Sequence, residues 1–202
     1  MKRLLFFFLI GCVAGAALLK VKERLPFALH EPVTVLPDGA QYDGDMINGV
    51  IEGKGRMFWP NGDRYTGSFK NGQFQGHGRL EFAGGAVYEG EFTNGAITGA
   101  GTLHYASGDR YTGKLKYGRA HGRGVLEARG SRYEGEFRDD RYQGAGKLTD
   151  KEGNIYTGAF ENGLFHGRGV YVTRDGRRYN GDFVAGNLTG AGIYTGKEGT
   201  HY

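Results

Sequence analysis

Large and small side chains alternate along most of this chain with a period of two residues. In Tyr65-Thr-Gly-Ser-Phe69 the first, third and fifth residues are tyrosine, glycine and phenylalanine, with polar residues between them. Such alternation is typical of a β-strand that has one buried and one solvated face. A second strand is predicted at Gly76–Phe82, where glycine or apolar residues again occupy every other position. No helical period follows residue 24.

Turn signals separate the predicted strands. Asn71-Gly72 lies between the first and the second strand, and both residue types adopt the positive φ angles that a two-residue hairpin turn requires. Gly85 lies in a second turn, which returns the chain to Tyr88. Residues 65–87 are therefore expected to form one antiparallel hairpin with its connection to the next.

This hairpin pattern recurs seven times. Each repeat begins with a tyrosine that is followed two residues later by glycine, at Tyr42, Tyr65, Tyr88, Tyr111, Tyr133, Tyr156 and Tyr179. Glycine occupies the third, twelfth and fourteenth places of every repeat, whereas the eighth place is glycine in all repeats except at Asp140. Glycine inside a strand usually marks the close approach of another group. We therefore expect aromatic rings to lie across these glycines, including Gly122 and Gly167 at the twelfth place.

The repeat resembles the MORN repeat family, whose consensus is close to Tyr-x-Gly-x-Phe-x-Asn-Gly-x-x-x-Gly-x-Gly. The segment from Tyr156 to Gly169 matches this consensus almost residue for residue, and the resemblance covers residues 42–202, with Val33–Gln41 as a preceding half repeat. It implies an all-β fold, an elongated single-layer antiparallel sheet of stacked β-hairpins. It also implies a membrane-proximal or scaffold module, since some members are proposed to bind phospholipid and others to bind proteins.

An apolar segment precedes the repeats. Residues 4–19 contain no charge and are followed by Lys20. As a helix they span about 24 Å, and Val21 with snorkelling lysines brings this close to the roughly 30 Å hydrocarbon core of a bilayer. The sequence thus predicts an N-terminal apolar helix, with a membrane anchor or signal segment at residues 1–24, a linker at 25–32 and the repeat domain at 33–202.

Two cleaved forms of this leader are alternatives to the anchor. Ala14-Gly15-Ala16 has the small-x-small pattern of a secretory cleavage site. Leu9-Ile-Gly-Cys12 resembles a bacterial lipobox, in which Cys12 would be the lipidated residue. Either alternative leads, like the anchor, to a membrane-associated or exported protein. Cys12 is the only cysteine, so no disulfide can form within the chain.

Charge excludes nucleic acid as a partner and singles out the fourth repeat. Residues 1–24 account for the formal net charge of +4, so the repeat domain is neutral overall. Opposite charges on neighbouring strands are the simplest explanation of charge that alternates between repeats. The alternative is an anionic-lipid patch in the fourth repeat, where six basic residues face only Glu127: Lys114, Lys116, Arg119, Arg123, Arg129 and Arg132.

No catalytic or cofactor motif is recognisable. The Gly-x-Gly pairs lie within predicted strands and precede no helix, whereas a nucleotide-binding loop needs a strand-to-helix turn. None of the six histidines has cysteine or carboxylate partners at metal-ligand spacing. We therefore expect neither an enzyme nor a bound metal or cofactor.

The sequence thus predicts a membrane-tethered scaffold that binds a protein or peptide through its sheet. Candidate partner-binding residues are the aromatic rings that begin the repeats: Tyr65, Tyr88, Tyr111, Tyr133, Tyr156 and Tyr179. Recognition of anionic lipid and an aromatic carbohydrate-binding ladder are the alternatives. A homodimer through the edge of the C-terminal strand is a further expectation, because a row of unpaired backbone groups is a template for another strand.

Overall fold

The computed structural model describes residues 33–196 and divides into two units, with the boundary in the chain between Ala106 and Ser107. Residues 33–196 contain β-strands and turns and no helix. The strands of the first unit are β1 (Thr34–Val35), β2 (Gln41–Ile47), β3 (Val50–Phe58), β4 (Arg64–Lys70), β5 (Gln73–Glu81), β6 (Val87–Thr93) and β7 (Ala96–His104). Those of the second unit are β8 (Arg110–Lys116), β9 (Arg119–Ala128), β10 (Ser131–Arg138), β11 (Arg141–Thr149), β12 (Ile155–Glu161), β13 (Leu164–Val172), β14 (Arg178–Val184) and β15 (Asn187–Thr195).

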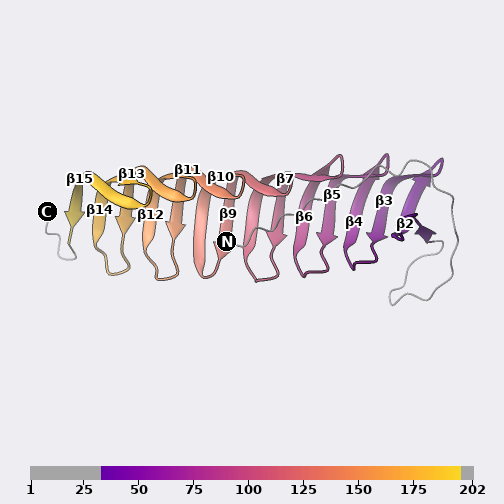
Figure 1. The fold of residues 1–202 in the computed structure, drawn as a ribbon, viewed down its shortest axis with the longest axis horizontal. Helices are drawn as coiled ribbons and strands as arrows, with labels where there is room; N and C mark the ends of the chain where they lie inside the picture. The colour runs from indigo at the N-terminus through magenta and orange to yellow at the C-terminus, as the bar shows by residue number, and fades with distance from the viewer. Residues whose placement is uncertain (1–32, 197–202) are drawn as a thin grey trace. The chain divides into compact units, whose positions relative to one another are not determined.

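Within each unit the strands pair antiparallel and in chain order, hairpin after hairpin (Figure 1). The predicted all-β class and hairpin order are therefore confirmed. The predicted N-terminal helix, the linker and Cys12 lie outside the described residues. Among residues 33–196 the structure contains no helix long and apolar enough to cross a membrane.

The two-residue turns form as the sequence predicts. Asn71 and Gly72 both have positive φ, at 50° and 76°, which matches the twist of the flanking strands. The Gly72 N–H also donates to the carbonyl oxygen of Ile51 in the preceding hairpin, at 2.9 Å. Each turn therefore both closes its own hairpin and fixes the position of the hairpin before it.

The core of each repeat is a tyrosine ring that lies over a pair of glycines. Gly67 and Gly78 face each other across the β4–β5 hairpin, and a Cβ added at Gly78 would lie 2.5 Å from the Tyr65 phenol oxygen. The Tyr65 hydroxyl donates to the carbonyl oxygen of Ser68 at 2.9 Å, and the Tyr65 ring stacks on Phe74 with centroids 3.8 Å apart. The predicted packing of rings on glycine is confirmed at the third and fourteenth places.

At the twelfth place the prediction was wrong. No ring atom lies within 4 Å of a Cβ added at Gly122 or Gly167; the nearest atoms belong to Lys114 and Ala159, at 3.5 and 3.8 Å. In each hairpin the residue pairing shifts here, so that the second strand holds extra residues in a β-bulge. Gly122 and Gly167 have φ of +68° and +60°. Glycine is needed at this place for its backbone conformation and not for ring contact.

Candidate partner-binding surface

The tyrosines that begin the repeats have an internal role. The exposed fraction is 1% or less for all of those in repeats two to six, and Tyr179 is half-buried. Each buried ring contacts at least one phenylalanine; Tyr65, for example, contacts Phe69 and Phe92 edge to face with centroids 5.1 Å apart. Five of the six rings predicted to bind a partner therefore stabilise the hairpins and have almost no surface to offer. The same burial removes the basis for an aromatic carbohydrate-binding ladder.

Burial also changes the acidity of these phenols. Desolvation is the main cause that raises the pKa of Tyr42 and of Tyr88 to about 12, and nearby carboxylates such as Asp45 and Glu91 add to it. Desolvation raises the pKa of Tyr65 and Tyr133 further still. The rings are thus neutral hydrogen-bond donors at any physiological pH.

The six basic residues of the fourth repeat do not form one patch. Strand alternation and register place four of them, Lys114, Lys116, Arg119 and Arg123, on the outer face of the β8–β9 hairpin, opposite to the buried Tyr111 ring. Arg129 lies in the turn between β9 and β10, where its N–H donates to Asp109. Arg132 lies on β10 and belongs to a separate cluster of charges.

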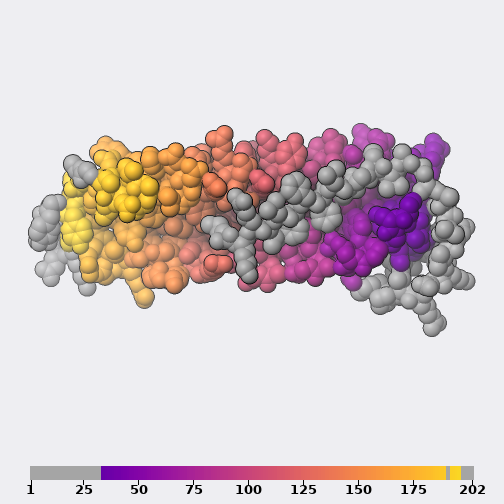
Figure 2. All heavy atoms as spheres, viewed as in Figure 1, coloured from indigo at the N-terminus to yellow at the C-terminus, as the bar shows by residue number. Residues whose placement is uncertain are grey.

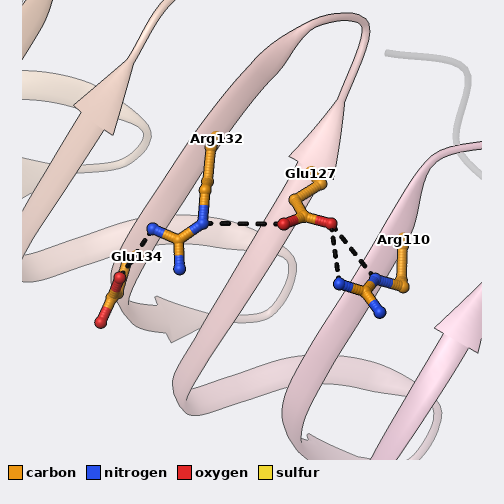
Figure 3. Close-up of polar contacts among 4 residues, drawn as sticks. All are labelled: Arg110, Glu127, Arg132 and Glu134. Carbon is orange, nitrogen blue, oxygen red and sulfur yellow. Dashed lines mark hydrogen bonds and ion pairs between the residues drawn. The ribbon is translucent and has the colours of Figure 1, made fainter.

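That cluster is a row of alternating charges across three strands (Figure 3). Glu127 on β9 contacts Arg110 on β8 at 2.9 Å and Arg132 on β10 at 3.6 Å. Arg132 also binds Glu134 at 2.7 Å. These side chains are about half exposed, so each pair contributes little to stability. The predicted cross-strand pairing of opposite charges is confirmed here, and it leaves Arg132 largely neutralised.

The structure adds two basic residues that the sequence reasoning missed. Arg138 and Arg141 face each other across the β10–β11 hairpin, and alternation places them on the same outer face as Lys116 and Arg119. They were overlooked because they belong to the fifth repeat, whose net charge is negative. Acidic groups accompany them: Asp140 accepts a hydrogen bond from the Ala120 N–H at 2.8 Å.

Exposed apolar side chains gather at another place in the second unit. Of the eight large hydrophobic residues with exposed side chains among residues 33–196, five lie on the last three strands, β13 to β15: Leu164, Val184, Leu188, Ile193 and Tyr194. Figure 2 shows this part of the second unit in light orange and yellow. Sequence periodicity identifies these positions as strand residues and cannot show that their neighbours leave them uncovered.

Leu188 and Tyr194 share the face of Tyr179, whereas the opposite, outer face carries Leu164 and Val184. Leu164 and Val184 are 49% and 51% exposed, and both lie next to the turns that connect β12 to β13 and β14 to β15. A Cβ added at Gly186 would lie 3.9 Å from Leu164 Cδ2, so the two turns are in contact. We call Leu164 and Val184 the outer apolar pair.

Residues 33–196 contain no group of three or more histidine, cysteine or carboxylate side chains placed to hold a metal ion. The one charged residue buried among them, Asp63, accepts hydrogen bonds from the Asn61 amide and the Ala83 N–H. Its role is to join two neighbouring turns.

Comparison with protein families assigns all of the repeats. The model described as "MORN repeat" matches residues 42–64, 65–87, 88–110, 111–129, 133–155, 156–177 and 179–201. The chain belongs to the MORN repeat family. All seven matches begin at a repeat tyrosine, so the resemblance and the repeat starts expected from the sequence are confirmed.

Two solved structures resemble this MORN-repeat chain in outline. The TCP domain of SAS-4 (dCPAP) from Drosophila melanogaster, solved with a proline-rich motif of Ana2, is 14% identical, covers 90% of this chain and 96% of that one, and has a TM-score of 0.47. The TCP10 domain of CPAP from Danio rerio, solved with a peptide of STIL, is 13% identical, covers 91% and 97%, and has a TM-score of 0.26. No curated protein matches the chain.

Proposed function

We propose that this MORN-repeat protein is a non-enzymatic binding module that recognises a protein or peptide partner. The observation that supports this proposal is the concentration of exposed apolar side chains on β13 to β15. Apolar side chains that are exposed next to one another often mark the contact with another molecule, and Leu164 and Val184 lie at adjoining turns. The repeat core supports the same function, because buried rings and hydrogen-bonded turns hold the strands in place before a partner arrives.

The outer apolar pair provides the test. Leu164→Glu together with Val184→Glu would place two charges in the proposed contact and lower partner capture about tenfold or more, since buried unpaired charges are costly. Full-length protein with an affinity tag is cross-linked in its source cells, and captured proteins are quantified by mass spectrometry. Ile47→Glu with Val50→Glu is the matched control, because these residues are equally exposed but lie at a turn of the first unit. Equal capture by both double variants would contradict the proposal.

Tethering to a membrane by residues 1–24 is part of the proposed function. It is supported by the uncharged run at residues 4–19. Full-length protein is expected to stay with membranes after alkaline extraction. Cys12→Ser separates the forms of the leader: an anchor keeps the variant in the membrane, whereas a lipoprotein loses it. Release of the unsubstituted protein by alkaline extraction would contradict the proposed membrane tether.

Binding of anionic lipid is the second candidate, favoured by the basic residues on the outer face of the β8–β9 and β10–β11 hairpins. It predicts that full-length protein prefers phosphatidylserine over phosphatidylcholine vesicles at about 0.1 M salt and loses the preference near 0.5 M. Arg119→Ala with Arg123→Ala should weaken that preference. Arg110→Ala with Arg132→Ala is the control, because both side chains are already paired with Glu127. Unchanged preference in both double variants would exclude this patch.

A further inference from the structure

Every second strand of an internal hairpin is covered by the first strand of the next hairpin. Between β13 and β14, Tyr171 lies opposite Tyr179, Gly169 opposite Gly181, and Gly167 opposite Phe183. The same register joins β3 to β4, β5 to β6 and β11 to β12, and it is continuous in all four pairs. In these four pairs the covering strand presents tyrosine, glycine and phenylalanine at alternate positions.

The aromatic residues of the covering strand complete the core of the repeat before it. Phe183 contacts the Tyr156 ring with centroids 5.0 Å apart and the Phe165 ring with centroids 5.9 Å apart, in both cases edge to face. Such pairs stabilise beyond the area that they bury. A repeat without a following strand thus lacks one of the rings that its own tyrosine needs.

The last repeat shows that loss. Leu188 occupies the tenth place, where Phe74 is 3% exposed, yet Leu188 is 57% exposed. Tyr194 occupies the sixteenth place, where Leu80 is 6% exposed, and it is 37% exposed. Tyr179 is half-buried, although every earlier repeat tyrosine is fully buried. Among residues 33–196 no strand lies beyond β15 to cover these side chains.

Strand β15 also lacks the devices that usually protect an edge. Residues 187–196 include no charged residue and no proline. In the first unit, the edge strand β1 has only two residues and is followed closely by Pro37. Short edge strands, prolines and charges are the usual means by which proteins prevent pairing with other chains. Within residues 33–196, β15 is therefore an edge without a covering strand and without these protective features.

We propose that β15 accepts an extended segment of a partner protein as an additional antiparallel strand, and that this segment carries the pattern Tyr-x-Gly-x-Phe. The proposal rests on the proposed function and names its partner's chemistry. By continuity with the internal register, the partner tyrosine lies opposite Tyr194 and its glycine opposite Gly192. The partner phenylalanine then lies opposite residue 190 and covers Tyr179 and Leu188.

The pattern follows from the internal contacts. Glycine is needed at the third place of the added strand to leave room for the tyrosine of that same strand. In β14, a Cβ at the equivalent Gly181 would lie 2.6 Å from the phenol oxygen of Tyr179. In a folded second copy the strands with this pattern are already between two paired neighbours, as β4, β6, β10, β12 and β14 are. The donor is therefore a segment that is not yet part of a sheet. Addition of a strand to an exposed edge is an established mode of peptide recognition.

A labelled peptide with the sequence of residues 156–162, Tyr-Thr-Gly-Ala-Phe-Glu-Asn, tests the proposal. Fluorescence anisotropy with full-length protein in mild detergent is expected to show one-to-one binding. A peptide with valine in place of glycine, and one with serine in place of both aromatic residues, are expected to bind at least about tenfold more weakly. Both comparisons use the unchanged protein, so they do not depend on how a variant folds.

Two protein variants separate this proposal from the proposed function. Leu188→Glu is expected to weaken peptide binding about tenfold, whereas Leu164→Glu with Val184→Glu should leave it unchanged. No binding, equal binding of the three peptides, or displacement of the peptide by a concentration-dependent dimer would each overturn the proposal; the last result would assign the edge to a second copy. Partner capture that depends only on the outer apolar pair would overturn it too, and the proposed function would stand.

Discussion

Glycine has two separate tasks in each repeat. At the fourteenth place Gly169 leaves room for the Tyr156 ring, whose phenol oxygen would lie 2.5 Å from an added Cβ. At the twelfth place Gly167 supplies a φ of +60° in the β-bulge, and a Cβ added there would lie no nearer than 3.8 Å to another side chain. The first task is steric and the second is conformational, so different substitutions should be tolerated at the two positions.

Substitution by alanine and by asparagine distinguishes the two tasks. Gly167→Ala is expected to lower the free energy of unfolding by about 1–2 kcal/mol, the usual cost of a left-handed backbone for a residue with a Cβ. Gly167→Asn should cost less, because asparagine adopts this conformation more readily. Gly169→Ala should cost about 1–3 kcal/mol through overpacking, and Gly169→Asn should cost more than alanine. Urea unfolding followed by circular dichroism measures all four values.

The order of the two substitutions is the deciding result. If asparagine were worse than alanine at both positions, Gly167 would be packed against a neighbour in the same way as Gly169. The bulge would then not explain the glycine at the twelfth place.

The repeat tyrosines predict how stability depends on pH. Burial raises the pKa of Tyr42 and Tyr88 to about 12, whereas tyrosine in an unfolded chain titrates near 10. Above pH 10 the unfolded state releases protons that the folded state keeps, so stability is lost as pH rises from about 10 to 12. Each such tyrosine contributes a slope of up to about 1.4 kcal/mol per pH unit. Below pH 9 these tyrosines should not make the free energy of unfolding depend on pH, because they are protonated in both states.

Absorbance of tyrosinate at 295 nm is the measurement for this prediction. It should rise together with the loss of the β-sheet circular dichroism signal, because the buried phenols ionise only when the sheet opens. Titration of most tyrosines near pH 10 with the sheet intact would contradict the burial of the rings.

Much of the residue-level structure could be predicted from the sequence. Asn71-Gly72 carries its turn conformation in its own chemistry, and the period of two in Tyr65-Thr-Gly-Ser-Phe69 places ring and glycine on one face. The bulge at Gly76 could not be predicted, since a shift in register is a property of two paired strands. Asp140 shows the same limit. It adopts a φ of 67° at a place where the other repeats have glycine, and its carboxylate accepts a hydrogen bond from the Ala120 N–H of the preceding hairpin.

At the level of elements, neighbouring strands are joined by backbone pairing and by short rows of charge on the outer face. Glu127 connects β8, β9 and β10 because Arg110 and Arg132 lie on either side of it (Figure 3). The count of basic residues in repeat four suggested one patch, but strand register separates Arg129 and Arg132 from the other four. A linear count contains no information on which strand end a residue occupies.

Glu127→Gln measures the contribution of this row. The substitution removes two exposed ion pairs and is expected to lower the free energy of unfolding by about 0.3–1 kcal/mol at low salt. The difference should nearly vanish in about 1 M NaCl, where charges are screened over about 3 Å. Glu152→Gln is the control, since Glu152 pairs only with Lys151 within one turn. A loss that persists in 1 M salt would show that Glu127 acts through packing instead of charge.

At the level of the whole molecule, repetition explains both the stability and the proposed binding site. Each hairpin needs the next one to cover its core, and β15 has no following strand among residues 33–196. The sequence could not predict that Leu188 and Tyr194 would be exposed in β15, because burial depends on the covering strand. The homodimer through this edge stays a prediction.

The glycine and tyrosine positions, through their resemblance to MORN repeats, predicted the fold. They did not identify the partner. Most repeat tyrosines are buried in the repeat core. We therefore expect the specificity for a partner to come from the surface residues that differ between repeats. The outer apolar pair and the exposed edge of β15 both lie in the last two hairpins. We therefore place the binding function of this protein at that end of the second unit.

Hydrogen–deuterium exchange on the full-length protein, with and without the peptide of residues 156–162, tests this placement most directly. Amides on the uncovered edge of β15 are expected to exchange faster than those of β11 to β13, which lie between paired strands. Saturating peptide should slow exchange in β15 about tenfold or more and leave β8 to β11 unchanged. Protection of β8 to β11 instead of β15, or no protection anywhere, would contradict the account.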